Sequence, residues 1–376
     1  MPDLKPEKIA IIGSAIAGLA SAIGCAKQGY EVHIFGQIPT KLAGGIQLAP
    51  NGFAALDKLD LLGAAKTQMI DLSAIEIRSI RTNALLAQID HNQNKAQKRD
   101  YASMRRADLI SIMHEKLRLC EHVYFHANAV RAIHNKQEAA TLMLDDGSQK
   151  DFDFVIGADG RTGLSRQFVD GTAKPASSDY VALRAIGDAR HLPASFSAKR
   201  TQLWLGDGAH IVHYPLAKDE VNLVICLPRP RAEIRQAIKQ IVQKTPSLQP
   251  LSEGIESWHM SDLPAAELCP VWRRQNVMLI GDAAHFMPPH LAQGAGQTLQ
   301  DAASLSDTLK NGGALLPCAK SWAQSRSREL APIVRRAEDT GAIMRLKGPF
   351  GRLRNMAIDL GGTRLLESWL AQVWRD

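Results

Sequence analysis

The sequence predicts an α/β protein: a discontinuous Rossmann-like nucleotide-binding domain, a mainly antiparallel β domain inserted into it, and C-terminal helices. Two observations carry this prediction. Short apolar runs, each as long as one buried parallel strand, lie far apart at residues 9–12, 154–156 and 277–280. Between about residues 171 and 265 the chain instead shows the alternation of antiparallel strands. The strands of one sheet are therefore separated along the chain by a second layer.

The N-terminal segment has the pattern of a strand, a tight turn and a helix. The apolar run 9–12 precedes a helix expected from about 16 to 28, which Gly29 caps, and Glu31–Phe35 supplies the next strand. Two lysines before an uncharged run also fit a signal peptide or a marginal membrane span. The glycines within the run and the strand that follows it favour a buried βαβ unit.

Later segments extend both layers. Residues 142–154 alternate around Asp145-Asp146-Gly147 as a hairpin does, and the tail from about residue 330 contains helices broken at Gly348-Pro349 and Gly361-Gly362. The inserted layer contains a helix near 232–243 and strands at 180–186, 201–204, 210–214 and 221–227. We assign the nucleotide-binding domain to residues 1–75, 100–170 and 270–345, the inserted substrate domain to 76–99 and 171–269, and the C-terminal helical tail to 346–376.

Composition narrows the classes of function. The chain has 376 residues, a formal charge of +7 and no block of Lys and Arg interleaved with aromatic residues, which argues against nucleic-acid binding. A modest basic charge suits anionic cofactors and carboxylate substrates. The five cysteines never form a C-x-x-C pair, so we expect no disulfide framework, no metal site and a cytoplasmic location.

The turn after the first strand has the spacing of a dinucleotide-binding motif. Gly13 stands where the first glycine makes the tight turn, and Gly18 where the third lets helix and strand pack closely. Ala15 replaces the middle glycine, and Gly36 occupies the place of the acidic residue that binds ribose hydroxyls. By itself this motif also fits plain helix packing, and two later segments favour the functional interpretation.

The more informative segment is Gly281-Asp282-Ala283-Ala284-His285, which follows a buried strand and precedes Gly294-Ala295-Gly296 and a helix. A carboxylate at a strand end accepts hydrogen bonds from sugar-like hydroxyls, and open amides at a helix start favour negative charge. Such a helix start would stabilise an anionic reduced flavin. Asp159 and Gly160 end another strand of the same predicted sheet.

Together these segments resemble the single-component, class A flavoprotein aromatic hydroxylases, and most of all the branch that contains salicylate and 6-hydroxynicotinate hydroxylases. The resemblance covers nearly the whole chain, through Gly13 to Gly18, Gly44 to Asn51, Met104 to Leu109, Gly157 to Gly160, His210 to Pro215 and Gly281 to Asp301.

The resemblance implies that FAD is the cofactor and NAD(P)H a co-substrate. It implies that Asp282 binds the ribitol chain, that Arg106 contacts the ribitol or pyrophosphate, and that Val130 contacts adenine through its backbone. Asp159 and Gly160 would serve both FAD and transient NAD(P)H binding. The other implied cofactor residues are Gly13, Gly18, Gly281 and, along the flavin ring, Gly294, Ala295, Gly296, Gln297 and Thr298.

In this family the flavin carries the oxidation: NAD(P)H reduces it, O2 adds to give a C4a-hydroperoxide, and an electron-rich aromatic ring takes one oxygen atom. The protein orients the substrate, excludes water and helps a phenolic hydroxyl lose its proton. The resemblance therefore predicts hydroxylation of a small phenolic or N-heteroaromatic acid.

Strand alternation selects residues that would contact the substrate. A period of two places His210, Val212 and Tyr214 on one face of a strand, and the resemblance places substrate contacts at His210 and Tyr214. The alternative is a histidine and a tyrosine that only fill the core. Gln47 is a further candidate, because its neutral amide can orient a substrate although it cannot deprotonate one.

Two other residues complete the predicted pocket. Arg184 would hold a carboxylate, contact the flavin or form a surface ion pair, and Pro288 would shape the pocket wall. His285 follows a strand terminus, so we interpret it as structural rather than catalytic.

Two rival functions stay open. One is hydroxylation of a polyprenylated quinone precursor at a membrane surface, which the basic charge and the tryptophan-containing stretch 365–374 allow. Core or dimer packing is the interpretation we favour for that stretch, which leaves a homodimer open. The other rival is a flavin-free binding or regulatory protein on the same fold, motivated by Ala15 and Gly36.

Overall fold

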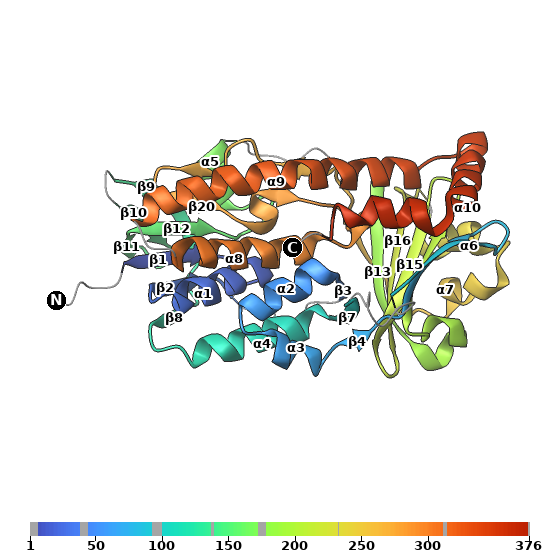
Figure 1. Ribbon diagram of the computed structural model, residues 1–376, viewed down its shortest axis with the longest axis horizontal. Coiled ribbons are helices and arrows are strands. Elements are labelled where there is room, and N and C mark those ends of the chain that lie inside the picture. Colours follow the sequence, from blue (N-terminus) through green and yellow to red (C-terminus); the bar gives the residue numbers. More distant parts are fainter. Residues whose placement is uncertain are drawn as a thin grey trace.

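The computed structural model describes residues 7–37, 44–91, 100–136, 139–171, 178–231, 233–310 and 314–374. Two large sheets lie at opposite ends of the molecule, and helices pack beside and between them (Figure 1). The α/β class with an added antiparallel layer, predicted from the sequence, is confirmed.

The first sheet contains the three apolar runs side by side. Its order is β19 (Arg273–Arg274), β20 (Val277–Leu279), β12 (Phe154–Gly157), β1 (Lys8–Ile12), β2 (Glu31–Phe35) and β8 (Val123–His126). All neighbours are parallel except β19 and β20. The central strands are almost wholly buried because helices or a second sheet cover both faces, as continuous apolar runs require.

The helices beside this sheet pack against one another. α1 packs against α4 and α8, and α2 packs against α8. Their bounds, with those of two shorter helices, are α1 (Ile16–Lys27), α2 (Pro50–Lys58), α3 (Leu62–Lys66), α4 (Arg106–Arg118), α5 (Leu164–Asp170) and α8 (Gly294–Lys310). The uncharged N-terminal run thus forms β1 and α1. No helix in the described part of the chain is long and apolar enough to cross a membrane.

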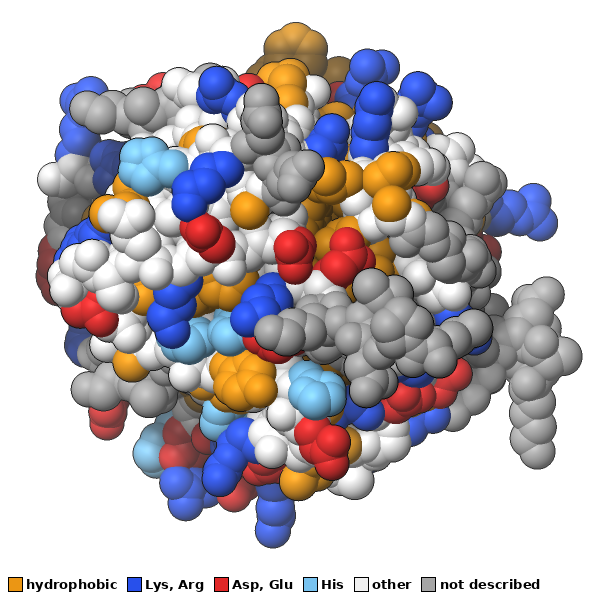
Figure 2. Space-filling model, turned by 90° about the vertical axis from the view of Figure 1, so that its left-hand side faces the viewer, with side chains coloured by type: hydrophobic (Ala, Val, Ile, Leu, Met, Phe, Trp, Pro, Cys, Tyr) orange, Lys and Arg blue, Asp and Glu red, His pale blue; other side chains and the backbone are white. Residues whose placement is uncertain are grey.

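A three-stranded antiparallel sheet lies next to the first one, and it consists of β9 (Val130–Asn135), β10 (Ala140–Leu144) and β11 (Gln149–Phe152). The predicted hairpin at Gly147 is confirmed, with φ +82° at that glycine. Figure 2 views the molecule from the end that carries β2 and β8, where acidic and basic side chains are interspersed and histidines lie among them.

The second large sheet has seven strands. Its order is β17 (His259–Asp262), β13 (Tyr180–Asp188), β16 (Glu220–Pro228), β15 (His210–Ala217), β14 (Arg200–Leu205), β5 (Ala74–Ser79) and β6 (Leu85–Asp90). Only β14 and β5 pair in parallel. One face packs on an apolar cluster that includes α6 (Ile234–Val242) and α7 (Pro250–Glu253). The strand β15 of this sheet also contacts β7 (Ala102–Arg105) and β4 (Ile70–Asp71), which lie outside the sheet.

A small sheet between the two large ones has no counterpart in the sequence prediction. It consists of β3 (Gly45–Leu48), β7 (Ala102–Arg105) and β4 (Ile70–Asp71), and both β7 and β4 contact β15. A second short pair joins β18 (Glu267–Leu268) to β21 (His285–Phe286). The small sheet brings the segment after Gly44 against the seven-stranded sheet.

Two long helices complete the chain, α9 (Leu315–Met344) and α10 (Gly348–Ala371). Both predicted breaks are present: α10 begins at Gly348, and Gly362 kinks it with φ +52°. The part of α10 after the kink returns along α9, where Trp369 Nε1 donates to Thr340 Oγ1 at 3.0 Å. The C-terminus consequently lies near α8, in the middle of the molecule (Figure 1).

Candidate active site

The turn between β1 and α1 requires both of its glycines. Gly13 has φ +115°, and a Cβ there would lie 2.4 Å from the carbonyl oxygen of Ala158. A Cβ at Gly18 would lie 1.8 Å from the carbonyl oxygen of Gly13. Ala15 is the N-cap of α1 and gives its first turn no side-chain cap, so the backbone amides there stay open for an anion.

The end of β2 carries no carboxylate. Gly36 has φ +134°, and its N–H donates to the carbonyl oxygen of His126. Ser14 Oγ donates to the carbonyl oxygen of Gln37 at 2.6 Å, which ties this strand end to the β1–α1 turn. The local structure is therefore stabilised by backbone groups.

Gly281 lies where the first turns of α1 and α8 meet. It begins a 3-10 turn, η5 (Gly281–Ala283), and has φ +59°. A Cβ there would lie 2.7 Å from Ala17 Cβ and 3.4 Å from the Thr298 side chain. The sequence motif thus brings two helix N-termini together beside Asp282.

Asp282 occupies a concave position. Its side chain is exposed, yet enough protein surrounds it that desolvation raises the pKa of its carboxyl, against the opposing effects of His285 and Arg106. An exposed group with that much protein around it lies on the wall of a cleft. Arg106, the first residue of α4, is likewise exposed and near enough to influence Asp282.

Asp159 lies beside the same turn, because Gly13 approaches the backbone of Ala158 and Asp159. One oxygen, Oδ2, accepts from the Ser165 N–H at 2.9 Å and so caps the start of α5. The other oxygen, Oδ1, is buried and has no partner among the described residues. Burial raises the pKa of this carboxyl. Helix capping therefore uses one oxygen and leaves the second for another donor.

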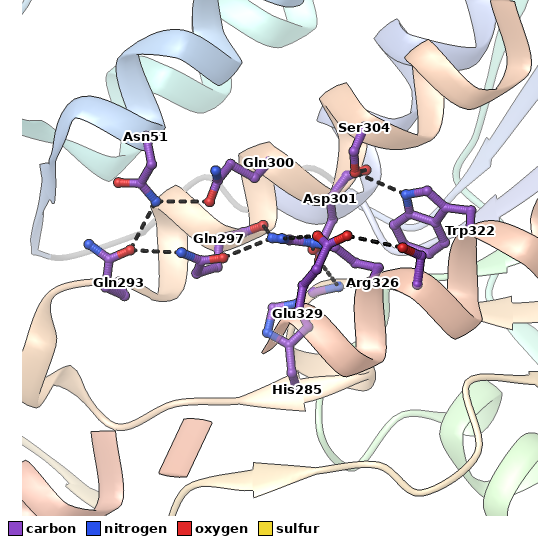
Figure 3. A network of polar contacts seen from close by, with 12 residues as sticks. Asn51, His285, Gln293, Gln297, Gln300, Asp301, Ser304, Trp322, Arg326 and Glu329 are labelled. Atoms are coloured by element: carbon purple, nitrogen blue, oxygen red, sulfur yellow. Dashed lines mark hydrogen bonds and ion pairs between the residues drawn. The ribbon is translucent and has the colours of Figure 1, made fainter. Parts of the chain in front are cut away.

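A buried ionic network is centred on Asp301, with His285 and Arg326 beside it (Figure 3). Asp301 Oδ2 accepts from the Gly281 N–H at 3.1 Å and lies 2.5 Å from His285 Nε2, while Arg326 Nε donates to Oδ1 at 2.8 Å. Asp301 and His285 are fully buried, and the interactions of Asp301 with His285 and Arg326 overcome desolvation and lower the pKa of Asp301. His285 is thus a partner of a buried carboxylate.

Gln297 belongs to this network, which changes the expectation for it. Its Oε1 accepts from Arg326 Nη2 at 2.8 Å, and its Nε2 donates to Gln293 Oε1 at 3.0 Å. The side chain is fully buried. Its polar atoms therefore hold α8 to α9 instead of facing the cleft.

One face of the seven-stranded sheet has an accessible apolar patch at its centre. Val212 and Val224 are opposite each other in register and only half-buried, although most of their neighbours are buried. His210 and Tyr214 share that face. His213 faces the opposite core, stacked on Phe196 with its Nε2 accepting from Trp204 Nε1. The alternation predicted from the sequence therefore separates a core histidine from the residues around the patch.

At one end of the patch, Tyr214 lies close to Gln47, which opposes the rise that burial causes in the pKa of the Tyr214 hydroxyl. Gln47 Oε1 accepts from Tyr101 Oη at 2.6 Å and from Thr201 Oγ1 at 3.1 Å. Arg184 lies near enough to influence Tyr214, and its Nη1 donates to Ser261 Oγ at 2.5 Å. Burial and then the charge of Arg106 lower the pKa of Arg184. Neither Arg184 nor Arg106 forms an ion pair with a carboxylate among the described residues.

At the other end, His210 meets His290, with ring centroids 5.3 Å apart. Both are buried, and His210 Nδ1 and both ring nitrogens of His290 have no partner in the part of the chain that is described. Burial lowers the pKa of His290 to about 4 and that of His210 well below its usual range. His290 was missed in the sequence, although it follows Pro288, which is buried one residue before η6 (Pro289–Leu291).

A cavity of about 480 Å³ opens elsewhere, and its lining includes Phe53, Lys66, Met69, Lys199 and Lys218. Its lining contains none of the predicted site residues. We therefore define the candidate site by its side chains rather than by this cavity.

Comparisons with known proteins agree with this geometry. Residues 7–311 match the family described as "FAD binding domain". The chain is 30% identical, over 93% of its length and 92% of the relative, to 3-amino-4-hydroxybenzoate 2-monooxygenase of Streptomyces platensis. It is 27% identical to 6-hydroxynicotinate 3-monooxygenase of Bordetella bronchiseptica, over 81% of the chain and 83% of the relative.

The chain belongs to the class A flavoprotein hydroxylases. The fold agrees as well: a salicylate hydroxylase solved as a substrate complex superimposes with a TM-score of 0.83 at 21% identity, over 99% of this chain and 96% of that one. The protein with the present sequence is therefore an FAD-dependent monooxygenase. The residues of its candidate site fit FAD. The first turn of α1 has no side-chain cap, Asp282 is exposed in a concave place, and Asp159 Oδ1 is buried without a partner among the described residues.

Val130 is the predicted cofactor residue with the least structural information. It begins β9 and pairs with Leu144. The strand pairing of Val130 does not place it beside Gly13 or Asp282, so its contact with the adenine of FAD stays a prediction.

Proposed function

We propose that this hydroxylase uses FAD, NAD(P)H and O2 to hydroxylate a small phenolic or N-heteroaromatic acid. The observation that carries the proposal is the half-buried patch of Val212 and Val224, which lies near Tyr214, Arg184 and Arg106. Among the described residues neither guanidinium has a carboxylate partner. An aromatic ring fits the patch, and a carboxylate fits the guanidiniums. The relatives named above act on an aminohydroxybenzoate and a hydroxynicotinate, both aromatic acids.

The cofactor would lie beside the N-termini of α1 and α8, where their first turns meet at Gly281. The open amides of α1 would hold the pyrophosphate, and Asp282 would accept hydrogen bonds from the ribitol hydroxyls. The start of α8, at Gly294–Gly296, would face the flavin ring, because a helix N-terminus stabilises its negative charge. When bound, FAD supplies the redox chemistry by taking electrons from NAD(P)H and activating O2.

The protein would orient the substrate through its charged end. Arg184 and Arg106 repel each other, which contributes to the lowered pKa of Arg184. A carboxylate bound beside Arg184 would relieve that repulsion and gain a charge-assisted hydrogen bond. Arg106, which also influences Asp282, would remain on the cofactor side.

The hydroxyl of the substrate, on the side of the ring away from the carboxylate, would lie near hydrogen-bonding side chains. Tyr214 and Gln47 form one group, and His210 with His290 forms another. The histidines are neutral at pH 7 because burial lowers the pKa of each, so each ring offers one acceptor nitrogen. A neutral acceptor of this kind helps a phenolic hydroxyl lose its proton. Pro288 would form part of the wall beside His290.

The absorption spectrum of the purified protein tests the cofactor. We expect bound flavin, and Asp282→Ala should lower the affinity for FAD at least tenfold, because a charge-assisted hydrogen bond is worth about 1.5–3 kcal/mol. Asp57→Ala, on the exposed side of α2, is the matched control and should bind FAD normally. A protein that neither copurifies with flavin nor shifts its melting temperature with added FAD would be the flavin-free alternative.

A panel of phenolic and heteroaromatic acids tests the substrate. We expect at least one to stimulate NAD(P)H oxidation and to yield a hydroxylated product by mass spectrometry. Arg184→Gln should raise KM for acids more than for the corresponding amides, because only the carboxylate needs the guanidinium. Equal effects on acids and amides would remove Arg184 from substrate binding.

A specific surface favours a second candidate, hydroxylation at a membrane surface. The first part of α10 exposes Phe350, Leu353, Met356 and Leu360. Such a stripe suits a bilayer or a homodimer. Co-sedimentation with anionic vesicles would support the membrane function, whereas a dimer in analytical ultracentrifugation without vesicle binding would assign the stripe to self-association.

A further inference from the structure

Asn222 is a buried amide on the sheet face that carries the apolar patch. It lies on β16, opposite Tyr214 of β15 and Ile186 of β13. Val224, two residues later on the same strand, belongs to the patch, and side chains two residues apart point to the same side of a sheet. Asn222 is only 1% exposed, whereas Ile186 beside it is 39% exposed. The amide is therefore enclosed, although part of the surrounding face is accessible.

A backbone contact sets the orientation of this amide. The Gly45 N–H donates to Asn222 Oδ1 at 2.8 Å. A backbone N–H can only donate, so it meets the oxygen of the side-chain amide and turns the nitrogen, Nδ2, away from Gly45. Gly45 approaches closely because it has no side chain: a Cβ there would lie 2.3 Å from Leu216 Cδ2 and 3.0 Å from Tyr214 Cε2. The direction of the two amide atoms is thus fixed by β3.

The nitrogen of the same amide has no partner. Asn222 Nδ2 is buried and makes no hydrogen bond to any described residue. A buried donor without an acceptor is destabilising, and most buried polar atoms in folded proteins are paired. Folding therefore leaves one amide donor beside the patch for an acceptor atom of a bound molecule.

Two guanidiniums indicate the charge of that molecule. Arg184 is opposite Val224 on β13, which makes it a diagonal neighbour of Asn222, within reach of a long side chain. The Arg106 N–H donates to the carbonyl oxygen of Gly44 at 3.2 Å, so α4 begins beside the segment that orients the amide. Cations without a carboxylate partner, next to an unpaired N–H, favour an anionic oxygen over a neutral one.

We propose that Asn222 is a substrate-binding residue: its Nδ2 donates to one oxygen of the substrate carboxylate, and Arg184 binds the other. The proposal rests on the proposed function for the class of substrate, an aromatic acid, and adds a residue that selects the carboxylate by hydrogen bonding. The attached ring would extend from these two residues over Val224 and Val212. Asn222 thereby distinguishes a carboxylate, which only accepts, from groups that donate at this position.

Asn222→Asp tests the donor while keeping the contact to Gly45. Aspartate retains an oxygen for the Gly45 N–H and replaces Nδ2 with a second oxygen, which repels a carboxylate. In calorimetric titrations of the FAD-loaded protein without NAD(P)H, its dissociation constants for 3-hydroxybenzoate and 6-hydroxynicotinate should rise at least about tenfold. Those for the corresponding carboxamides, whose NH2 can donate to the new oxygen, should change less than about threefold. Asn83→Asp adds the same charge at an exposed turn between β5 and β6 and should change neither.

Asn222→Ala tests the same donor without adding a charge. The matched control is Ser103→Ala, because Ser103 Oγ donates to the carbonyl oxygen of Pro215 at 2.5 Å and so forms another buried contact between the small sheet and the seven-stranded sheet. Each variant loses one such contact, and both should melt at a lower temperature. Only Asn222→Ala should also bind the acids at least about tenfold more weakly.

The outcomes separate this inference from the proposed function. If Asn222→Ala and Ser103→Ala bind the acids equally well, or Asn222→Asp weakens acids and carboxamides by the same factor, Asn222 only holds β3 and the inference is wrong. A loss of FAD affinity with unchanged affinity for the acids would assign Nδ2 to the cofactor and refute the inference as well. A wild-type protein that takes up FAD but binds no acid of the panel refutes the proposed function, and the inference with it.

Discussion

The replacement Asp301→Asn tests the support of the Gly281 turn most directly. Asp301 is fully buried and is contacted by His285, Arg326 and the Gly281 N–H at 2.5, 2.8 and 3.1 Å. Asparagine keeps the volume and removes the charge, which leaves the buried Arg326 with only the exposed Glu329, at 3.3 Å, as a counter-ion. Breaking a buried pair in this way costs about 3–5 kcal/mol of unfolding free energy. At an unfolding entropy of about 2 cal/mol/K per residue, a chain of 376 residues should melt about 4–6 °C lower.

The same replacement should weaken FAD binding, because Gly281 leads directly into Asp282. The assays are thermal unfolding and FAD titration by flavin fluorescence. Asp307→Asn is the matched control: it lies on the same helix, α8, and its pair with Lys58 is more than half exposed. An exposed pair is worth about 0–1 kcal/mol, so that variant should melt within about 1 °C of wild type. Equal melting temperatures for the two variants would refute the reasoning.

Three further predictions follow from the geometry. Tyr214→Phe should keep FAD but lower the coupled product yield about tenfold, and a normal yield would exclude that hydroxyl from catalysis. Gly18→Ala should lower the free energy of unfolding by about 1–3 kcal/mol and reduce the amount of bound flavin, because its Cβ would overlap the Gly13 carbonyl. Gly63 has open space around it, so Gly63→Ala should change neither. The pKa of His290 falls from 6.5 to about 4 on folding, so the unfolded chain binds more protons between these values and stability should fall as pH is lowered from 6.5 to 4. His290→Gln should remove roughly 2–3 kcal/mol of this loss in unfolding free energy at pH 4, so its melting temperature should depend less on pH. An unchanged pH dependence would show that His290 is not the group responsible.

The sequence predicted those features that depend on local pattern. The three apolar runs identified the parallel sheet because strands buried on both faces need no alternation. Alternation at 210–214 separated the Tyr214 face from the core, and glycines at 348 and 361–362 located the breaks of the last helix. Each of these depends on neighbouring residues alone, so a single sequence contains the information.

The residues that were missed depend on contacts between distant segments. Tyr101 and Trp374 lie 273 positions apart, and neither neighbourhood indicates that the two rings meet. The small sheet of β3, β7 and β4 has strands of two to four residues, too short to show a period. His290 follows two prolines in a turn, where no periodicity marks a side chain as buried. Gln297 was placed along the flavin ring through the family resemblance alone, and nothing near it in the sequence indicates that its side chain hydrogen-bonds to Arg326.

The same buried groups support the cofactor end and the substrate end of the site. Asp301 fixes the Gly281 turn and binds Arg326 of α9, while Arg326 binds Gln297, whose Nε2 contacts the carbonyl oxygen of Val373. Trp374, one residue later, packs on Tyr101 behind Gln47. Because α9 anchors both ends, a disturbance of Asp301 should reach Gln47 as well as Asp282. Asp301→Asn should therefore lower the amount of hydroxylated product formed per NAD(P)H oxidised, even when FAD is saturating. Measuring that ratio at saturating FAD tests the prediction.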